Sequence, residues 1–152
     1  MQRLNFPFYS HKFKNKQNKT YIFDIIRKKY FVLTPEEWVR QNCILFLINE
    51  KKYPASLISV EKSFTVNNIL KRYDVIIYTS SGLIKVLVEC KSTKIKINSN
   101  TFDQIAQYNM TLNSEYLMVT NGLDHYFCKM DFESKTYDFM KTLPIYEHYN
   151  FI

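Results

Sequence analysis

The sequence predicts an α/β fold, a sandwich in which helices flank a central mixed β-sheet. Three observations lead to this prediction: a strong helix start at Thr34, three successive strand-like segments between residues 57 and 90, and an amphipathic segment followed by another strand between residues 101 and 120. The core order is therefore helix, three strands, helix, strand. The strand after the second helix should lie parallel to the strand before it, through a right-handed crossover.

The N-terminal part leads into the first helix. Residues 20–26 and 29–33 are rich in β-branched and aromatic side chains, which predicts two strands. Thr34-Pro35-Glu36-Glu37 then supplies an N-cap, a proline at the first helical position and an acid three residues after the cap. A helix is therefore expected over residues 35–49. Trp38 on this helix is expected to anchor the core rather than to stack on a base.

Strands and a second helix follow. Three strands are expected at residues 57–64, 72–79 and 83–90. The turn signal Ser80-Ser81-Gly82 joins the last two as a hairpin. Residues 101–112 carry a helical stripe of apolar side chains, and Thr101 with Gln104 has the spacing of a capping box. Further strands are predicted at residues 115–120, 125–130 and 136–140.

Length and composition favour one domain of 152 residues. It is divided into a basic N-terminal arm with strands at residues 1–33, a core at residues 34–132 and a C-terminal extension at residues 133–152. No apolar run has the length of a secretory or membrane-spanning segment, so a soluble, cytoplasmic protein with no membrane partner is expected. The three cysteines are an odd number and widely spaced, which is typical of reduced thiols in the core and not of a disulfide framework or a zinc site. They are Cys43, Cys90 and Cys128.

The formal charge of +7 is concentrated near the N-terminus. Residues 1–30 contain eight Lys or Arg and a single acid, Asp24, whereas the rest of the chain has as many acids as bases. A DNA phosphate backbone is a natural partner for Lys12, Lys14 and Lys16. A solubilising, partly disordered tail is the alternative interpretation.

Charged residues gather at the open end of the predicted hairpin. Because strand side chains alternate, Glu89 and Lys91 face the same side. If the hairpin folds about Ser81, position 74 lies opposite roughly position 88, which brings Asp74 close to Glu89. Two carboxylates and one amine therefore meet there. The alternative is a cross-strand charge cluster on a solvated face.

The residue types at this end suit metal-dependent hydrolysis. Mg²⁺ prefers oxygen ligands, with Mn²⁺ as an expected substitute, and Asp74, Glu89 and the Cys90 backbone carbonyl could provide three. Such an ion would activate water and neutralise phosphate charge. Lys91 would polarise that water and stabilise the transition state.

A wider set of residues resembles a known nuclease superfamily. Asp74, Glu89-Cys90-Lys91 and a following helix with Gln104 and Tyr108 are similar to the PD-(D/E)XK pattern, and the chain resembles more narrowly the N-terminal nuclease domain of type I restriction enzyme R subunits. The resemblance covers roughly residues 34–132. It implies a Mg²⁺-dependent DNA endonuclease with a restriction-endonuclease-like core. Tyr73 replaces the usual proline before the aspartate, and no Gly-x-x-x-x-Gly-Lys loop is present, so this chain alone has no nucleotide-driven motor.

The superfamily pattern also suggests outer members of the site. Glu37, with Glu36 as a weaker candidate, would hold a second metal or a water, but Glu37 could instead complete a capping box with Thr34. Gln104 and Tyr108, one helical turn apart, would contact DNA or orient catalytic groups. Their alternatives are a helix cap for Gln104 and a core position for Tyr108.

Three further expectations concern binding and partners. Lys71 and Arg72 would bind phosphates beside the cleft, unless they are only solvated. His125 is expected to be a surface histidine, because no ligand-type residue accompanies it at metal-binding spacing. A homodimer is plausible for cutting both strands. The rival functions are a non-cleaving DNA-binding accessory domain of the same fold and an interaction module whose charges are structural.

Overall fold

The computed structural model describes residues 1–147, so residues 148–152 of the expected C-terminal extension lie outside the described residues. The large sheet has six strands, which lie side by side in the same order as they follow along the chain. They are β4 (Ile58–Val66), β5 (Ile69–Tyr78), β6 (Ile84–Cys90), β7 (Tyr116–Thr120), β8 (His125–Asp131) and β9 (Thr136–Met140). Neighbouring strands pair antiparallel, except β6 and β7, which are parallel. The sheet is therefore mixed, as predicted.

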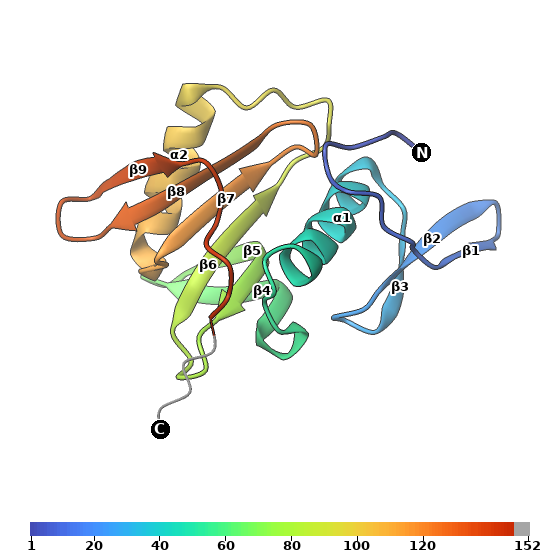
Figure 1. The fold of residues 1–152 in the computed structure, drawn as a ribbon, viewed down its shortest axis with the longest axis horizontal. Helices are drawn as coiled ribbons and strands as arrows, with labels where there is room; N and C mark the ends of the chain where they lie inside the picture. Colours follow the sequence, from blue (N-terminus) through green and yellow to red (C-terminus); the bar gives the residue numbers. More distant parts are fainter. Residues whose placement is uncertain (148–152) are drawn as a thin grey trace.

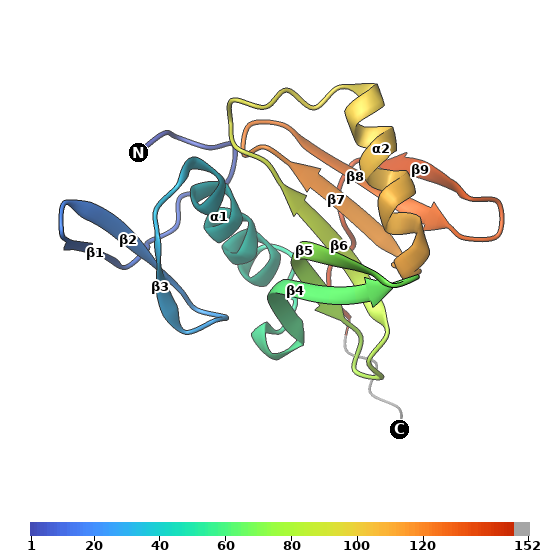
Figure 2. The same ribbon diagram turned by 180° about the vertical axis from the view of Figure 1, so that it is seen from behind.

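Two α-helices cover opposite faces of this sheet (Figures 1 and 2). Helix α1 spans Pro35–Asn49, the predicted range, and α2 spans Ser99–Asn109 between the parallel strands β6 and β7. Short 3₁₀ turns lie at Ala55–Leu57 and Met110–Leu112. The expected α/β sandwich, with helices flanking a mixed sheet, is confirmed.

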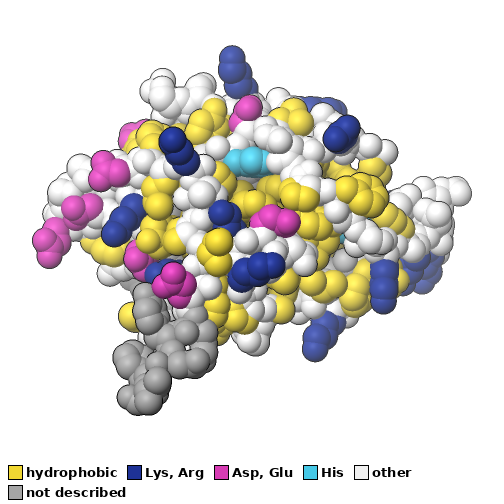
Figure 3. Space-filling model, viewed as in Figure 1, with side chains coloured by type: hydrophobic (Ala, Val, Ile, Leu, Met, Phe, Trp, Pro, Cys, Tyr) yellow, Lys and Arg dark blue, Asp and Glu magenta, His cyan; other side chains and the backbone are white. Residues whose placement is uncertain are grey.

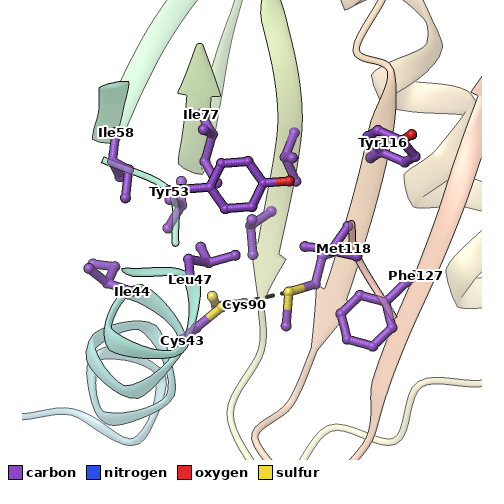
Figure 4. Close-up of a cluster of buried hydrophobic side chains, with 14 of the residues drawn as sticks. Cys43, Ile44, Leu47, Tyr53, Ile58, Ile77, Cys90, Tyr116, Met118 and Phe127 are labelled. Atoms are coloured by element: carbon purple, nitrogen blue, oxygen red, sulfur yellow. Dashed lines mark hydrogen bonds between the residues drawn. The ribbon is translucent and has the colours of Figure 1, made fainter. Parts of the chain in front are cut away.

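Strand alternation gives the sheet one hydrophobic cluster on each face. On one face, Cys43 and Leu47 of α1 pack among buried residues of β5, β6 and β7 (Figure 4). On the other face, Phe102 and Ala106 of α2 pack against Leu87 and other residues of the same strands. All three cysteines are buried and free, as expected. The two-sided burial fixes β6 as a central strand, so the charges at its end are held by a rigid element.

The basic arm is an ordered sheet, not a partly disordered tail. β1 (Phe13–Lys16), β2 (Lys19–Asp24) and β3 (Lys29–Val32) form a three-stranded antiparallel sheet beside α1 (Figure 1). Strand β1 is absent from the sequence prediction. The fully buried Asp24 carboxylate accepts hydrogen bonds from Arg27 Nε at 2.7 Å and from Gln41 Nε2 at 2.8 Å. The bond from Gln41 attaches the small sheet to α1.

Three local expectations differ from the structure. The N-cap of α2 is Asn98, whose Oδ1 accepts from Thr101 N at 2.8 Å, so the capping box from Thr101 to Gln104 is wrong. Trp38 packs only at the edge of the core and is partly exposed. His125 is partly buried rather than a surface residue, because its Nδ1 bonds Thr120 Oγ1 at 2.7 Å and its ring packs against the N-terminal segment.

Within residues 1–147, neither helix has the length and apolar character that a membrane crossing requires.

Candidate active site

β5 and β6 bring two carboxylates together at one end of the sheet. The turn alone predicted that Asp74 faces position 88, but a β-bulge next to Tyr78 shifts the pairing by one residue. Val75 consequently pairs with Val88, and continuing this register puts Asp74 opposite Glu89. The expected approach of the two carboxylates is present. Its register differs by one residue, because a bulge adds a residue to one strand without a signal in the turn.

The two carboxylates influence each other strongly. Burial, followed by the negative charge of Asp74, raises the pKa of Glu89 well above the ordinary value of a glutamate, while nearby Lys91 opposes the shift. Asp74 is fixed in place: its Oδ2 accepts from the Cys90 backbone N at 2.7 Å and its Oδ1 from Arg40 Nη2 at 3.0 Å. The pair is therefore a concentration of negative charge that a cation would relieve.

Lys91 lies just beyond the end of β6. Its backbone N donates to Thr120 O at 2.8 Å, which ties this position to the end of the neighbouring strand β7. Within residues 1–147, no carboxylate lies within 4.0 Å of its ammonium, so the Lys91 ammonium forms no salt bridge there. A partly exposed ammonium beside two carboxylates is free to contact a phosphate.

Arg40 of α1 is a central member of this site that the sequence prediction missed. Its Nη2 lies 3.0 Å from Asp74 Oδ1, 2.9 Å from Glu61 Oε1 and 3.1 Å from Glu36 Oε1, and its Nη1 pairs with Glu37. The Arg40 side chain is only 6% exposed; burial by itself lowers its pKa, but the charges of Asp74 and Glu37 outweigh that effect and raise the pKa. One guanidinium therefore balances much of the acidic charge. The available signal was a lone cation one turn after Glu36 and Glu37.

Glu61 joins the site through an irregularity in β4. It lies between the paired residues Val60 and Lys62, opposite Asp74, and its backbone φ is +57°. Such a φ is uncommon for a residue with a side chain and costs energy. The Glu61 carboxylate reaches both Arg40 and Arg72. Regular strand alternation gave no reason to expect this.

Glu37 is held by basic and amide partners. Its backbone N donates to Thr34 Oγ1 at 3.0 Å, which forms the N-cap half of the expected box. Its carboxylate, however, pairs with Arg27 and Arg40 and accepts from Gln41 Nε2 at 3.1 Å. Glu37 thus links the small sheet to α1, and its catalytic role stays a prediction. Glu36 is more exposed; burial and then Asp74 raise its pKa.

The outer candidates on α2 occupy its solvent-facing side. Gln104 is exposed and does not cap the helix, and Tyr108 is 44% exposed rather than a core residue. The Tyr108 ring lies 6.2 Å from the Tyr73 ring and 4.2 Å from Lys71 Nζ. Burial, followed by Tyr108 and then Glu89, raises the pKa of Tyr73 to about 12. Tyr73 therefore contacts Tyr108 and is close enough to Glu89 to be influenced by that carboxylate.

The donor set suits a hard divalent cation with an incomplete protein shell. Within residues 1–147, no three His, Cys, Asp or Glu side chains form a ready metal cluster. Mg²⁺ typically takes only one or two carboxylates and keeps water or substrate oxygens at its other positions. Asp74 and Glu89, with the Cys90 carbonyl expected as a third oxygen, fit that pattern. Their mutual repulsion supports the same assignment.

The expected DNA-binding lysines lie apart from the carboxylates. Lys14 and Lys16 on β1 and Lys12 just before it are exposed, and Figure 3 shows Lys and Arg side chains at the β1–β2 end of the molecule. Acidic side chains on this face gather toward the opposite end, near β8 and β9. Arg72 is 70% exposed, and its Nη2 pairs with Glu61. The charge distribution is therefore asymmetric along the long axis.

Comparison with known proteins identifies the family. Among curated proteins, a search finds no match. A family model described as Type I restriction enzyme R protein N terminus (HSDR_N) matches residues 35–144. This region contains both α-helices and the whole six-stranded sheet, with the carboxylates at its end. The match confirms the expected resemblance, a restriction-endonuclease-like fold and a nuclease-related role: the chain belongs to the family of type I restriction enzyme R protein N-terminal domains.

Proposed function

We propose that this protein is a Mg²⁺-dependent DNA endonuclease whose reaction centre is Asp74, Glu89 and Lys91. The observation that carries the proposal is the cross-strand approach of Asp74 to Glu89, with the unpaired ammonium of Lys91 two residues further along, in a domain of this family. The cytoplasm is the proposed location. Mn²⁺ is the proposed substitute ion.

In this proposal, each residue has its own role in phosphodiester hydrolysis. Asp74, Glu89 and the Cys90 carbonyl would hold the cation, which lowers the pKa of the attacking water and neutralises phosphate charge when bound. Lys91 would orient that water and stabilise the negative charge that develops on the phosphate oxygens. The water oxygen forms the new bond to phosphorus, the bond to the leaving oxygen breaks, and the proton lost by water balances the one gained by the leaving group.

Nicking of supercoiled plasmid tests this proposal. Asp74→Asn and Lys91→Ala should each lower the Mg²⁺- or Mn²⁺-dependent rate at least about a hundredfold while the fold is kept. The matched controls are Asp138→Asn and Lys129→Ala, which change exposed residues on β9 and β8. Full activity in both site variants would overturn the assignment. Nicked product before linear product would indicate a monomer, and direct linearisation the proposed homodimer.

A non-cleaving DNA-binding accessory domain is the second candidate. One observation favours it: both Asp74 oxygens already accept hydrogen bonds, from Arg40 and from the Cys90 backbone. A cation would have to share or replace the Arg40 contact. Salt-sensitive DNA binding with no cleavage in Mg²⁺ or Mn²⁺, and no metal binding by calorimetry, would support this candidate over the nuclease.

A further inference from the structure

An aromatic groove lies between the N-terminal segment and α1. Its volume is about 620 Å³, within the range of ligand-binding pockets. The lining includes Arg3, Phe6, Phe8, His11, Phe13 and Trp38. On the face in Figure 3, hydrophobic side chains are exposed where the N-terminal segment crosses α1. The groove is thus an apolar surface that the small sheet and α1 leave open.

The rings in this groove are close to one another but incompletely covered. The His11 ring centroid lies 5.0 Å from that of Trp38, and the Phe13 centroid 6.3 Å from it. Phe13 is 44% exposed and Phe8 is 96% exposed. Exposed apolar surface of this kind marks interaction sites. Trp38 has its indole Nε1 fixed by Gln2 O at 2.8 Å, which leaves the ring oriented and partly exposed.

The charge around the groove selects an anionic occupant. Arg3 is part of the lining, whereas Lys12 and Lys14 lie over the rings of Phe23 and Tyr30 on the small sheet. Of the residues described, those that line the groove include no Asp or Glu. Aromatic rings interleaved with cations are the usual surface for single-stranded nucleic acid, because bases stack on the rings and phosphates contact the cations.

The groove continues toward the proposed active site. A smaller hollow of about 240 Å³ shares Met1, Gln2 and Trp38 with it and extends to Thr93. Thr93 follows Lys91 by two residues, and its Oγ1 donates to Gln2 Oε1 at 2.6 Å. A nucleic-acid strand bound in the groove would therefore lead to the loop that carries Lys91.

We propose that this groove binds an unpaired nucleotide of the DNA substrate, with its base on the aromatic rings and its phosphate near Arg3. The inference rests on the proposed function and specifies its substrate class. Bases in a duplex have both faces covered by neighbours, so only an unpaired base can use these rings. DNA with an overhang, flap or gap is then preferred to continuous duplex.

The single tryptophan of the chain gives a direct test. The full chain in EDTA is titrated with a twelve-residue oligothymidylate or with its blunt duplex, and Trp38 fluorescence is excited at a wavelength that tyrosine does not absorb. We expect saturable quenching by the single strand at lower concentrations than by the duplex. Equal affinity for both, or no quenching by the single strand, would overturn the proposal. A concentration-dependent change without DNA would instead indicate that a second copy covers the groove.

Variants locate the binding. Phe8→Ala should weaken single-strand affinity between about fivefold and 150-fold without affecting folding, because Phe8 packs against little. Phe139→Ala is the matched control, since Phe139 is 61% exposed on β9. Unchanged affinity in Phe8→Ala and Phe13→Ala together would overturn the site. EDTA prevents cleavage, so this result is separate from the nuclease proposal, which nicking of duplex plasmid tests on its own.

Discussion

At the scale of single residues, Glu89 couples the proposed metal site to pH. Burial, followed by the charge of Asp74, raises its pKa to about 8. An acid whose pKa is higher in the folded chain than in the unfolded chain stabilises the fold when it is protonated. This contribution is fully present below the unfolded pKa of about 4.3 and is lost as the pH rises through about 8.

Glu89 should therefore raise the melting temperature of the metal-free protein at low pH, and this contribution should decrease as the pH rises from about 5 to about 8. Glu89→Gln should flatten this dependence, because an amide does not ionise. Mg²⁺ should raise the melting temperature of the wild type more at pH 8 than at pH 6, since it binds the ionised carboxylate. Thermal unfolding in EDTA and in Mg²⁺ measures both effects. If the melting temperature of Glu89→Gln changed with pH as steeply as that of the wild type and of the control Asp138→Asn, the proposed role of Glu89 would be contradicted.

Arg40 should be more important for stability than its single charge suggests. Arg40→Met removes the cation and leaves Glu37 and Asp74 partly buried without it, so the free energy of unfolding should fall by about 3–5 kcal/mol. Urea denaturation measures the change. Arg72→Met is the comparison: that side chain is 70% exposed, and its loss should cost less than about 1 kcal/mol. Equal effects of the two substitutions would refute a central role for Arg40.

The placement of the proposed reaction-centre residues near one another could be predicted in part, because it depends on local patterns. Strand alternation predicts that Glu89 and Lys91 face the same side, and Lys91 is close enough to influence the Glu89 carboxylate although β6 ends at Cys90. Arg40 depends on contacts between residues far apart in the sequence, since its acidic partners come from α1, β4 and β5. Glu61 could not be predicted at all, because its side-chain direction follows from a positive φ within a strand.

At the scale of elements, the helices differ in how clearly the sequence marks their starts. The Thr34 cap and the proline after it predicted α1 with its observed bounds. Helix α2 begins at Ser99, two residues before the predicted start, because Asn98 and not Thr101 provides the cap. Asparagine and threonine both cap helices, and only the backbone conformation decides between them.

Replacement of these two residues should therefore have unequal effects. Asn98→Ala removes the acceptor for the Thr101 backbone N and should lower the free energy of unfolding by about 1 kcal/mol. Thr101→Ala leaves that acceptor in place and should change stability by less than half as much. Chemical denaturation of both variants measures the difference. A larger loss of stability in Thr101→Ala than in Asn98→Ala would instead support the capping box that the sequence suggested.

Strand pairing shows another limit of sequence reasoning. The turn at Ser80-Ser81-Gly82 correctly predicted a hairpin between β5 and β6. The bulge next to Tyr78 then changes which residues face each other, and a one-residue shift decides whether Asp74 lies opposite Glu89. No glycine lies next to Tyr78, so the sequence gives no signal that predicts the bulge.

At the scale of the whole molecule, the order of elements was enough to predict the mixed sheet and its parallel pair. A strand, a helix and a further strand have few ways to pair, and the parallel arrangement of β6 and β7 is the expected one. The position of the small sheet could not be predicted, because buried polar contacts of Asp24 and Glu37 attach it to α1. Its lysines therefore form a fixed basic surface at one end.

This fixed surface should determine how DNA affinity depends on salt. Replacing Lys12, Lys14 and Lys16 together with alanine should reduce the slope of log affinity against log salt by about 0.9 for each phosphate that the protein no longer neutralises. The control replaces Lys129, Lys135 and Lys141, exposed residues at the β8–β9 end, and should leave the slope unchanged. Fluorescence anisotropy with labelled duplex in EDTA measures both slopes. Equal slopes in the two triple variants would mean that DNA approaches without using the small sheet, because counterion release depends on which phosphates are neutralised.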